Sequence, residues 1–126
     1  MTAPKVDLDS APWWDGLRAH HVVVQQCRVC HHCWLPRTPS CPYCGADTPA
    51  DREHPGDGAV YSFVRAHRAM SDAMAAEVPY TIAAVELDGG GRVFARVDGD
   101  CAIGARVTPD FVDHDTWTEL RYREVR

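Results

Sequence analysis

The sequence lacks the segments that would send it into or across a membrane. No apolar run approaches the roughly 20 residues that a membrane-spanning helix needs, and residues 1–10 have neither the basic start nor the apolar stretch of a secretory signal. A cytoplasmic protein that does not associate with membranes is therefore expected.

An excess of basic residues is also absent. The 126 residues include 13 Lys and Arg against 18 Asp and Glu, a formal net charge of −5, and the basic residues are scattered along the chain. We therefore expect no extended surface that neutralises the phosphates of a nucleic acid. With 45% hydrophobic and 25% charged residues, the composition is that of an ordinary folded protein, which excludes global disorder.

No catalytic fingerprint is present. The sequence has no nucleophile elbow, P-loop or dinucleotide-binding motif, and glycines 89–91 lie between two strand-like runs, as in a hairpin turn. The acidic run 110–115 offers ligands for a hard cation, but a solvated loop is the simpler interpretation. The candidate general bases form no recognisable constellation; they are His20, His21, His67 and His114. We predict no catalytic residue and expect that the chain is not an enzyme by itself.

What the sequence does have is six cysteines, four of them in two C-x-x-C pairs. Ten residues separate Cys27-x-x-Cys30 from Cys41-x-x-Cys44, enough for a hairpin that brings two knuckles to opposite sides of one ion. Four thiolates leave no open coordination position, which is typical of structural Zn²⁺. Sulfur geometry alone does not separate zinc from iron, so a mononuclear iron site of rubredoxin type stays open, as do redox dithiols or disulfides.

Cys33 leaves the register of the first pair open. Cys30-x-x-Cys33 also has ligand spacing, and the two histidines between them are further potential ligands. We prefer the pairing of Cys27 with Cys30, because it places the β-branched run 22–24 directly before the knuckle. Cys101 lies far from the cluster, and we predict that it is a small buried hydrophobic residue.

The pattern of the remaining residues predicts a mainly β protein. A short helix is expected after Ser10, which can cap it, and its apolar side chains share one face. Residues 67–78 are expected to form a loop or a helical turn. Strands are predicted at residues 22–26, 34–39, 59–65, 80–87, 92–97, 104–108 and 117–122. About five strands in the second half suit a small Greek-key barrel of OB type.

The chain is expected to divide into four parts. Residues 47–58 contain two Pro and two Gly among charged residues, without the periodicity of a helix or a strand, and we therefore predict a linker there. The parts are an N-terminal segment with the helix, a zinc ribbon, the linker and the barrel, at residues 1–21, 22–48, 49–58 and 59–126.

Trp13 and Trp14 are candidates for a partner interface. Neighbours on a helix lie about 100° apart, so the two rings are not expected to point together into one small domain, and aromatic residues are enriched at the centres of protein contacts. The alternative, that both rings pack on the ribbon and the barrel of the same chain, stays open.

Several short segments, in their order and spacing, resemble one known family. They are residues 13–17 (Trp-Trp-Asp-Gly-Leu), 26–30 (Gln-Cys-Arg-Val-Cys), 36–37, 41–45 (Cys-Pro-Tyr-Cys-Gly), 58–63, 67–68 and 79–87. Over nearly its whole length the chain is similar to the acyl-CoA-associated zinc-ribbon and OB-fold proteins known as domain of unknown function thirty-five. The resemblance implies an N-terminal helix, a rubredoxin-like zinc ribbon and an OB barrel that does not bind nucleic acid. Cys33 and residues 69–77 depart from the family.

The resemblance also implies a function. Family members serve as non-catalytic partners of acyl-CoA enzymes, chiefly thiolases of the lipid-transfer type and hot-dog hydratases. The two proteins form hetero-oligomers, some of which act in the degradation of steroid side chains. The partner supplies the catalytic residues, and the small protein shapes the acyl-CoA site. Two other functions stay open. One is a stand-alone binder of acyl-CoA or an acyl carrier protein, with Arg65, His67, Arg68 or Arg96 as phosphate contacts, and the other is an OB-fold binder of single-stranded nucleic acid.

Overall fold

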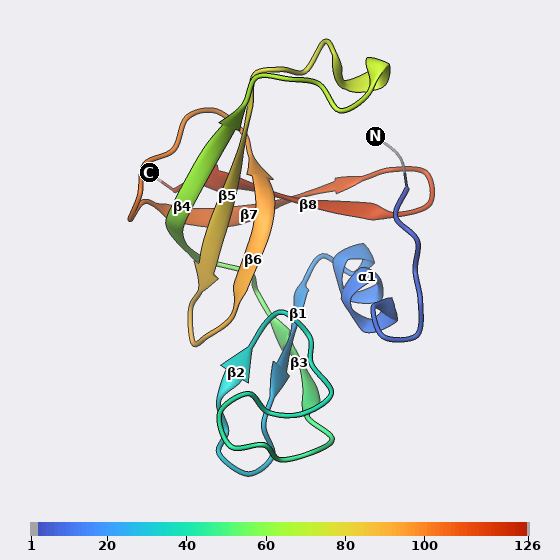
Figure 1. The fold of residues 1–126 in the computed structure, drawn as a ribbon, viewed down its shortest axis with the longest axis vertical. Coiled ribbons are helices and arrows are strands. Elements are labelled where there is room, and N and C mark those ends of the chain that lie inside the picture. Colours follow the sequence, from blue (N-terminus) through green and yellow to red (C-terminus); the bar gives the residue numbers. More distant parts are fainter. Residues whose placement is uncertain (1–2, 126) are drawn as a thin grey trace.

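The computed structural model describes residues 3–125. Its elements are α1 (Ala11–Arg18), β1 (Val22–Gln26), β2 (Cys33–Trp34), β3 (Ala50–His54), β4 (Gly58–Ala66), the 3₁₀ turn η1 (Asp72–Met74), β5 (Tyr80–Leu87), β6 (Arg92–Val97), β7 (Arg106–Asp113) and β8 (Thr118–Glu124). The helix lies beside β1, and the barrel formed by β4 to β8 stands at the other end of β1 from the cysteine loops (Figure 1).

The second half of the chain closes into a barrel, which we call the barrel throughout, with the strand order β4-β5-β6-β8-β7. All pairings are antiparallel except that of β6 with β8, which is parallel. The alternation in β5 explains its place, because Ala83, Val85 and Leu87 point into the core. The predicted mainly β fold with an N-terminal helix and a five-stranded OB barrel is confirmed.

The first half forms a three-stranded sheet in the order β2-β1-β3, and with its cysteine loops this sheet is called the ribbon below. The prediction that residues 47–58 contain no strand was wrong, because β3 pairs with all five residues of β1. The three central residues of β3 are exposed, and its sequence has no alternation of apolar and polar residues. Backbone hydrogen bonds to the apolar strand β1 therefore hold β3 in place. The division into domains at the expected residues stays a prediction.

Two further strand boundaries differ from expectation. The strand expected at 34–39 is reduced to β2, because only two residues pair with β1. The strand expected at 104–108 continues as β7 through Asp113, so the acidic run expected to be a loop lies partly in a strand. There β7 pairs with β8 over seven residues, and this ladder overrides the polar composition. Residues 67–78, expected to form a loop or a helical turn, contain one 3₁₀ turn.

The helix begins after Ser10, although the side chain of Ser10 does not cap it. The Ser10 hydroxyl accepts the backbone N–H of Asp7 at 3.1 Å, and Asp7 Oδ1 in turn accepts the N–H of Ser10 at 2.8 Å. This reciprocal pair fixes the chain just before the helix. Leu17, only 1% exposed, anchors the helix in the core and so sets the direction in which Trp13 and Trp14 project.

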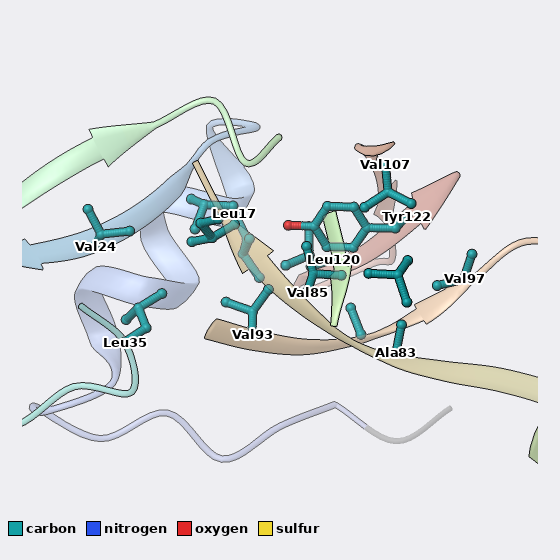
Figure 2. Close-up of a cluster of buried hydrophobic side chains, with 14 residues drawn as sticks. Leu17, Val24, Leu35, Ala83, Val85, Val93, Val97, Val107, Leu120 and Tyr122 are labelled. Carbon is teal, nitrogen blue, oxygen red and sulfur yellow. The ribbon is translucent and has the colours of Figure 1, made fainter. Parts of the chain in front are cut away.

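One apolar core extends through helix, ribbon and barrel. In Figure 2, Leu17 lies next to the barrel side chains around the ring of Tyr122, and Val24 and Leu35 continue the cluster on the ribbon side. Tyr122 is fully buried, and its hydroxyl donates to the carbonyl oxygen of Gly56 at 2.7 Å. Burial raises the pKa of Tyr122, so the hydroxyl stays a donor.

Gly56 lies between β3 and β4, where the ribbon joins the barrel. Its φ of +96° favours glycine, and a Cβ there would lie 2.4 Å from Cγ of Pro109 and 3.0 Å from Cγ2 of Val22. The join between the two sheets is therefore closely packed, and the Tyr122 hydrogen bond holds it.

We predict that Tyr122→Phe lowers the free energy of unfolding by about 1–2 kcal/mol, because the buried Gly56 carbonyl loses its donor while the ring still fills the core. Tyr61→Phe, at a side chain that is 52% exposed, is the matched control and should change little. Urea unfolding followed by tryptophan fluorescence measures both. Equal stability of the two variants would contradict the role given to this hydrogen bond.

Candidate metal centre and apolar groove

The four cysteines of the two C-x-x-C pairs come together at the end of the ribbon. One sulfur from each of Cys27, Cys30, Cys41 and Cys44 lies within 4.8 Å of all the others. Cys27 Sγ is 3.5 Å from Cys44 Sγ, and Cys30 Sγ is 3.6 Å from Cys41 Sγ, so each close contact joins the two knuckles.

Backbone N–H groups point at the sulfurs in both knuckles. The N–H groups of Val29 and Cys30 each donate to Cys27 Sγ at 3.3 Å, and the second knuckle repeats the pattern on Cys41 at 3.3 and 3.4 Å. The hydrogen bond from the N–H of Cys30 has the largest effect on the pKa of Cys27. Together with the bond from Val29 it outweighs burial and lowers this pKa to about 6. Such donors stabilise thiolate, the form that binds metal.

The donor set fits a soft, tetrahedrally bound cation. Around the sulfurs the ribbon has only a small apolar cluster, in which Trp34 is buried with Cys27 and Cys41. A cluster this small contributes little stability by itself, so a metal held by the four sulfurs would supply the missing cross-links. The cluster is therefore able to bind a metal.

Cys33 lies outside this cluster. It begins β2 and packs against the core, and its carbonyl oxygen would be 2.5 Å from a Cβ at Gly90, whose φ is +120°. The two neighbouring histidines are exposed, although His32 Nδ1 approaches Cys30 Sγ to 3.3 Å while its ring stacks on Tyr43. The geometry therefore favours Cys27 over Cys33 as the partner of Cys30.

A groove lies between α1, the turn η1 and the β5-β6-β8 surface of the barrel. Its volume is about 470 Å³, and its walls are mostly aromatic and aliphatic. The aromatic and aliphatic lining residues include Trp13, Trp14, Tyr80, Ile82, Phe94 and Trp117. We call this feature the groove.

Three of the four tryptophans meet at the groove. Trp14 lies edge-to-face with Trp13 at 6.5 Å and with Trp117 at 6.1 Å between ring centroids. Both helix tryptophans are half-buried and pack against the core of their own chain, the arrangement left open as the alternative to an interface. Sequence reasoning missed Tyr80, Phe94 and Trp117, because they lie on or beside separate strands that only the barrel brings together.

Glu119 is a buried carboxylate in the wall of the groove and is 5% exposed. It accepts hydrogen bonds from Arg121 Nε at 3.0 Å and lies 2.9 Å from His114 Nε2. Burial by itself raises the pKa of Glu119, but the hydrogen bonds from Arg121 and His114 outweigh burial and hold the pKa below its ordinary value of 4.5. Sequence reasoning gave no role to this residue.

The predicted phosphate contacts are divided by the structure. Arg65, near the end of β4, lines a polar pocket of about 180 Å³ and forms an ion pair with Asp100. This polar pocket shares Tyr80 and Arg96 with the groove, so the two hollows are adjacent. His67 and Arg68 are exposed in the loop that follows and line neither hollow.

The other residues singled out in the sequence have structural surroundings. Cys101, predicted to be a small buried hydrophobic residue, packs against the core but is only half-buried. His20 stacks on Phe111 at 5.0 Å and bonds to Asp113 at 3.0 Å, which fixes the chain after α1 against β7. Among residues 3–125, no helix is long and apolar enough to cross a membrane.

Comparisons with known proteins agree on one relationship. A family model described as ChsH2, C-terminal OB-fold domain, matches residues 51–112. The solved structure of an Ltp2-ChsH2(DUF35) aldolase is similar with a TM-score of 0.83 and 31% sequence identity, over 97% of this chain and 98% of that chain. A DUF35 protein of unknown function from Sulfolobus solfataricus has a TM-score of 0.69 at 15% identity, over 95% of this chain and 87% of that chain, which shows the fold alone.

A curated protein is also related to the chain. It is a probable enoyl-CoA hydratase alpha subunit of Thermomonospora curvata, 33% identical over 116 residues. The match covers 89% of this chain but 36% of that protein, so the chain spans about a third of the length of its relative.

We predict that Cys41→Ser greatly reduces the metal that purifies with the chain, from about one ion per chain, because one of four soft ligands is replaced. Cys33→Ser, the matched control outside the cluster, should keep its metal. Elemental analysis of purified protein measures both, and circular dichroism reports whether the ribbon is lost with the metal. A Cys41→Ser chain with full metal content would contradict the cluster as the binding site.

The stability of the fold should depend on pH through the buried carboxylate of Glu119. Because the folded pKa of Glu119 lies below its ordinary value, the charged form stabilises the fold above about pH 4.5, and this contribution is lost as the pH falls through the folded pKa. Glu119→Gln should lower the free energy of unfolding by about 1–3 kcal/mol at pH 7, with a smaller difference at pH 3. Denaturant unfolding at both pH values checks this, with Glu124→Gln, an exposed residue of β8, as control. A constant difference across pH would contradict it.

Proposed function

The chain belongs to the DUF35 family with a ChsH2-type OB fold, and from this membership we propose that it is a non-catalytic accessory subunit of an acyl-CoA-processing complex. The supporting observation is the 31% identity to the Ltp2-ChsH2(DUF35) aldolase, which extends over nearly the full length of both chains. In the proposal the enzyme partner is a lipid-transfer-type thiolase-like protein and supplies the catalytic residues. A cytoplasmic hetero-oligomer and the absence of nucleic acid remain parts of this prediction.

The related hydratase subunit supports a second identity for the partner. About a third of that protein matches this chain. In the proposal a separate enzyme subunit supplies the part of the relative that lies outside the match. A hot-dog hydratase partner is therefore the alternative within the same function.

In the proposal the metal is structural Zn²⁺, held by Cys27, Cys30, Cys41 and Cys44. Four thiolate ligands with inward-pointing N–H groups support a structural metal, since a closed sulfur shell leaves no position for a substrate, and zinc is the metal typical of such sites. The ion would cross-link the end of the ribbon and take no part in the reaction.

The proposed acyl-CoA site lies where the groove adjoins the polar pocket. Arg65 and Arg96 are the phosphate contacts that this arrangement supports, because both line the polar pocket, while His67 and Arg68 remain weaker candidates on an exposed loop. The half-buried Trp13 and Trp14 at the groove remain the candidate contacts with the partner, which would complete the site. The same two hollows favour one other function, a stand-alone binder of acyl-CoA or an acyl carrier protein.

Affinity capture of the tagged chain from its native organism tests the proposal, with mass spectrometry of the proteins that co-purify. We expect a thiolase-like or hydratase enzyme in stoichiometric amount. When that enzyme is purified and assayed on acyl-CoA substrates, adding the chain should raise kcat/KM by about tenfold or more, equivalent to about 1.4 kcal/mol of transition-state stabilisation.

The controls separate the alternatives. The chain without its partner should show no turnover, and a chain that turns over acyl-CoA alone would contradict a non-catalytic role. Tight binding of CoA by the isolated chain, with no enzyme captured, would favour the stand-alone binder. Capture of nucleic acid in place of an enzyme would overturn the proposal.

A further inference from the structure

The four sulfurs of the cysteine cluster have unequal surroundings. Cys27 and Cys41 are 1% and 3% exposed, and the sulfur of each accepts two backbone N–H groups. Cys30 is half-buried, and Cys44 is exposed. Water and competing ligands therefore reach the cluster from the side of Cys30 and Cys44.

A histidine lies on this open side. Nδ1 of His32 is 3.3 Å from Sγ of Cys30, and within residues 3–125 it is the only side-chain nitrogen at hydrogen-bond distance from any of the four sulfurs. A thiolate only accepts hydrogen bonds, so beside a metal-bound Cys30 the Nδ1–H of His32 is the donor. The four mutually close ligand atoms are all sulfurs, so His32 stands beside the cluster and is not a fifth member of it.

Both the backbone and the ring of His32 are held in place. The carbonyl oxygen of His32 accepts the N–H of Cys27 at 2.9 Å, after His31, with a φ of +66°, has turned the chain back toward the start of the knuckle. The imidazole stacks on Tyr43 of the other knuckle, with 4.4 Å between ring centroids and 20° between the planes. The stack therefore links the two knuckles and keeps Nδ1 beside Cys30.

A donor in this position has a chemical effect on the ligand. A hydrogen bond to an ionised acceptor is roughly twice as strong as one between neutral groups, and it draws negative charge away from the thiolate. At a half-buried sulfur it also takes up acceptor capacity that a proton from solution would use during loss of the metal. Groups that hydrogen-bond to the ligands of a metal typically change its affinity by about 10–100-fold.

We propose that His32 is a positioning residue of the metal centre, which donates Nδ1–H to Cys30 and thereby tightens metal binding without being a ligand. The sequence offered the two histidines after Cys30 only as potential ligands. The inference rests on the metal site of the proposed function, and it is independent of the acyl-CoA role and of the partner.

Two substitutions in the full chain separate the hydrogen bond from the stack. His32→Phe keeps a ring to stack on Tyr43 but has no donor, and it should weaken Zn²⁺ binding about tenfold. His32→Asn loses the ring but keeps an amide N–H close to the place of Nδ1, and its affinity should stay within about threefold of that of the wild-type chain. Competition for Zn²⁺ with the chromogenic chelator 4-(2-pyridylazo)resorcinol measures each affinity.

His31→Asn is the matched control. His31 is exposed in the same knuckle, and Asn tolerates its positive φ, so this variant should bind Zn²⁺ within about twofold of the wild-type chain.

The Co²⁺-loaded chains give a readout that stacking alone would not change. A hydrogen bond stabilises the sulfur electrons, so its loss in His32→Phe should move the sulfur-to-cobalt charge-transfer absorption to longer wavelength, while His32→Asn should leave it in place.

The outcomes separate this inference from the metal site itself. A wild-type chain that binds no Zn²⁺ would contradict the site and, with it, the role of His32. Wild-type affinity in His32→Phe would leave the site standing and overturn the role of His32. Weakened binding in both His32 variants with no shift of the charge-transfer absorption would assign the effect to the stack on Tyr43 and would also overturn the proposal.

Discussion

The hydrogen bond from Tyr122 to Gly56 lies at the point where two small sheets are joined into one molecule. Neither the ribbon nor the barrel is large, and the core becomes continuous because Leu17, Val22 and Val24 pack with the barrel side chains around this tyrosine. A buried hydroxyl needs a partner, and the carbonyl of Gly56, in the segment between β3 and β4, provides it. The junction is therefore both closely packed and hydrogen-bonded.

The position of the groove follows from the same junction. Leu17 is held in the shared core, which sets the rotation of α1 about its own axis. The two tryptophans of the helix therefore project toward the barrel surface. There Trp117 lies between Trp14 and His114, and His114 contacts the buried Glu119. Helix, core and ion-pair network together form one wall of the groove.

The two candidate sites have different chemistry and lie apart. The cysteine cluster is at the end of the ribbon that points away from the barrel, as Figure 1 shows for the loops around β2 and β3. The groove is on the barrel side of α1. This separation suits a structural metal, because a cation among four thiolates would stabilise the ribbon without entering the place where a substrate could bind.

The sequence by itself determined the features that depend on local pattern. The two C-x-x-C pairs, the alternation of residues 80–87 and the glycine turn after them indicated the metal cluster and the barrel hairpin, because knuckles and tight turns are made by neighbours in the chain. Only the tertiary structure decided that the polar residues 50–54 form a strand, since pairing with β1 supplies what their own side chains do not. It also decided the groove, because Trp14, Phe94 and Trp117 are far apart in sequence and meet only when the barrel closes against the helix.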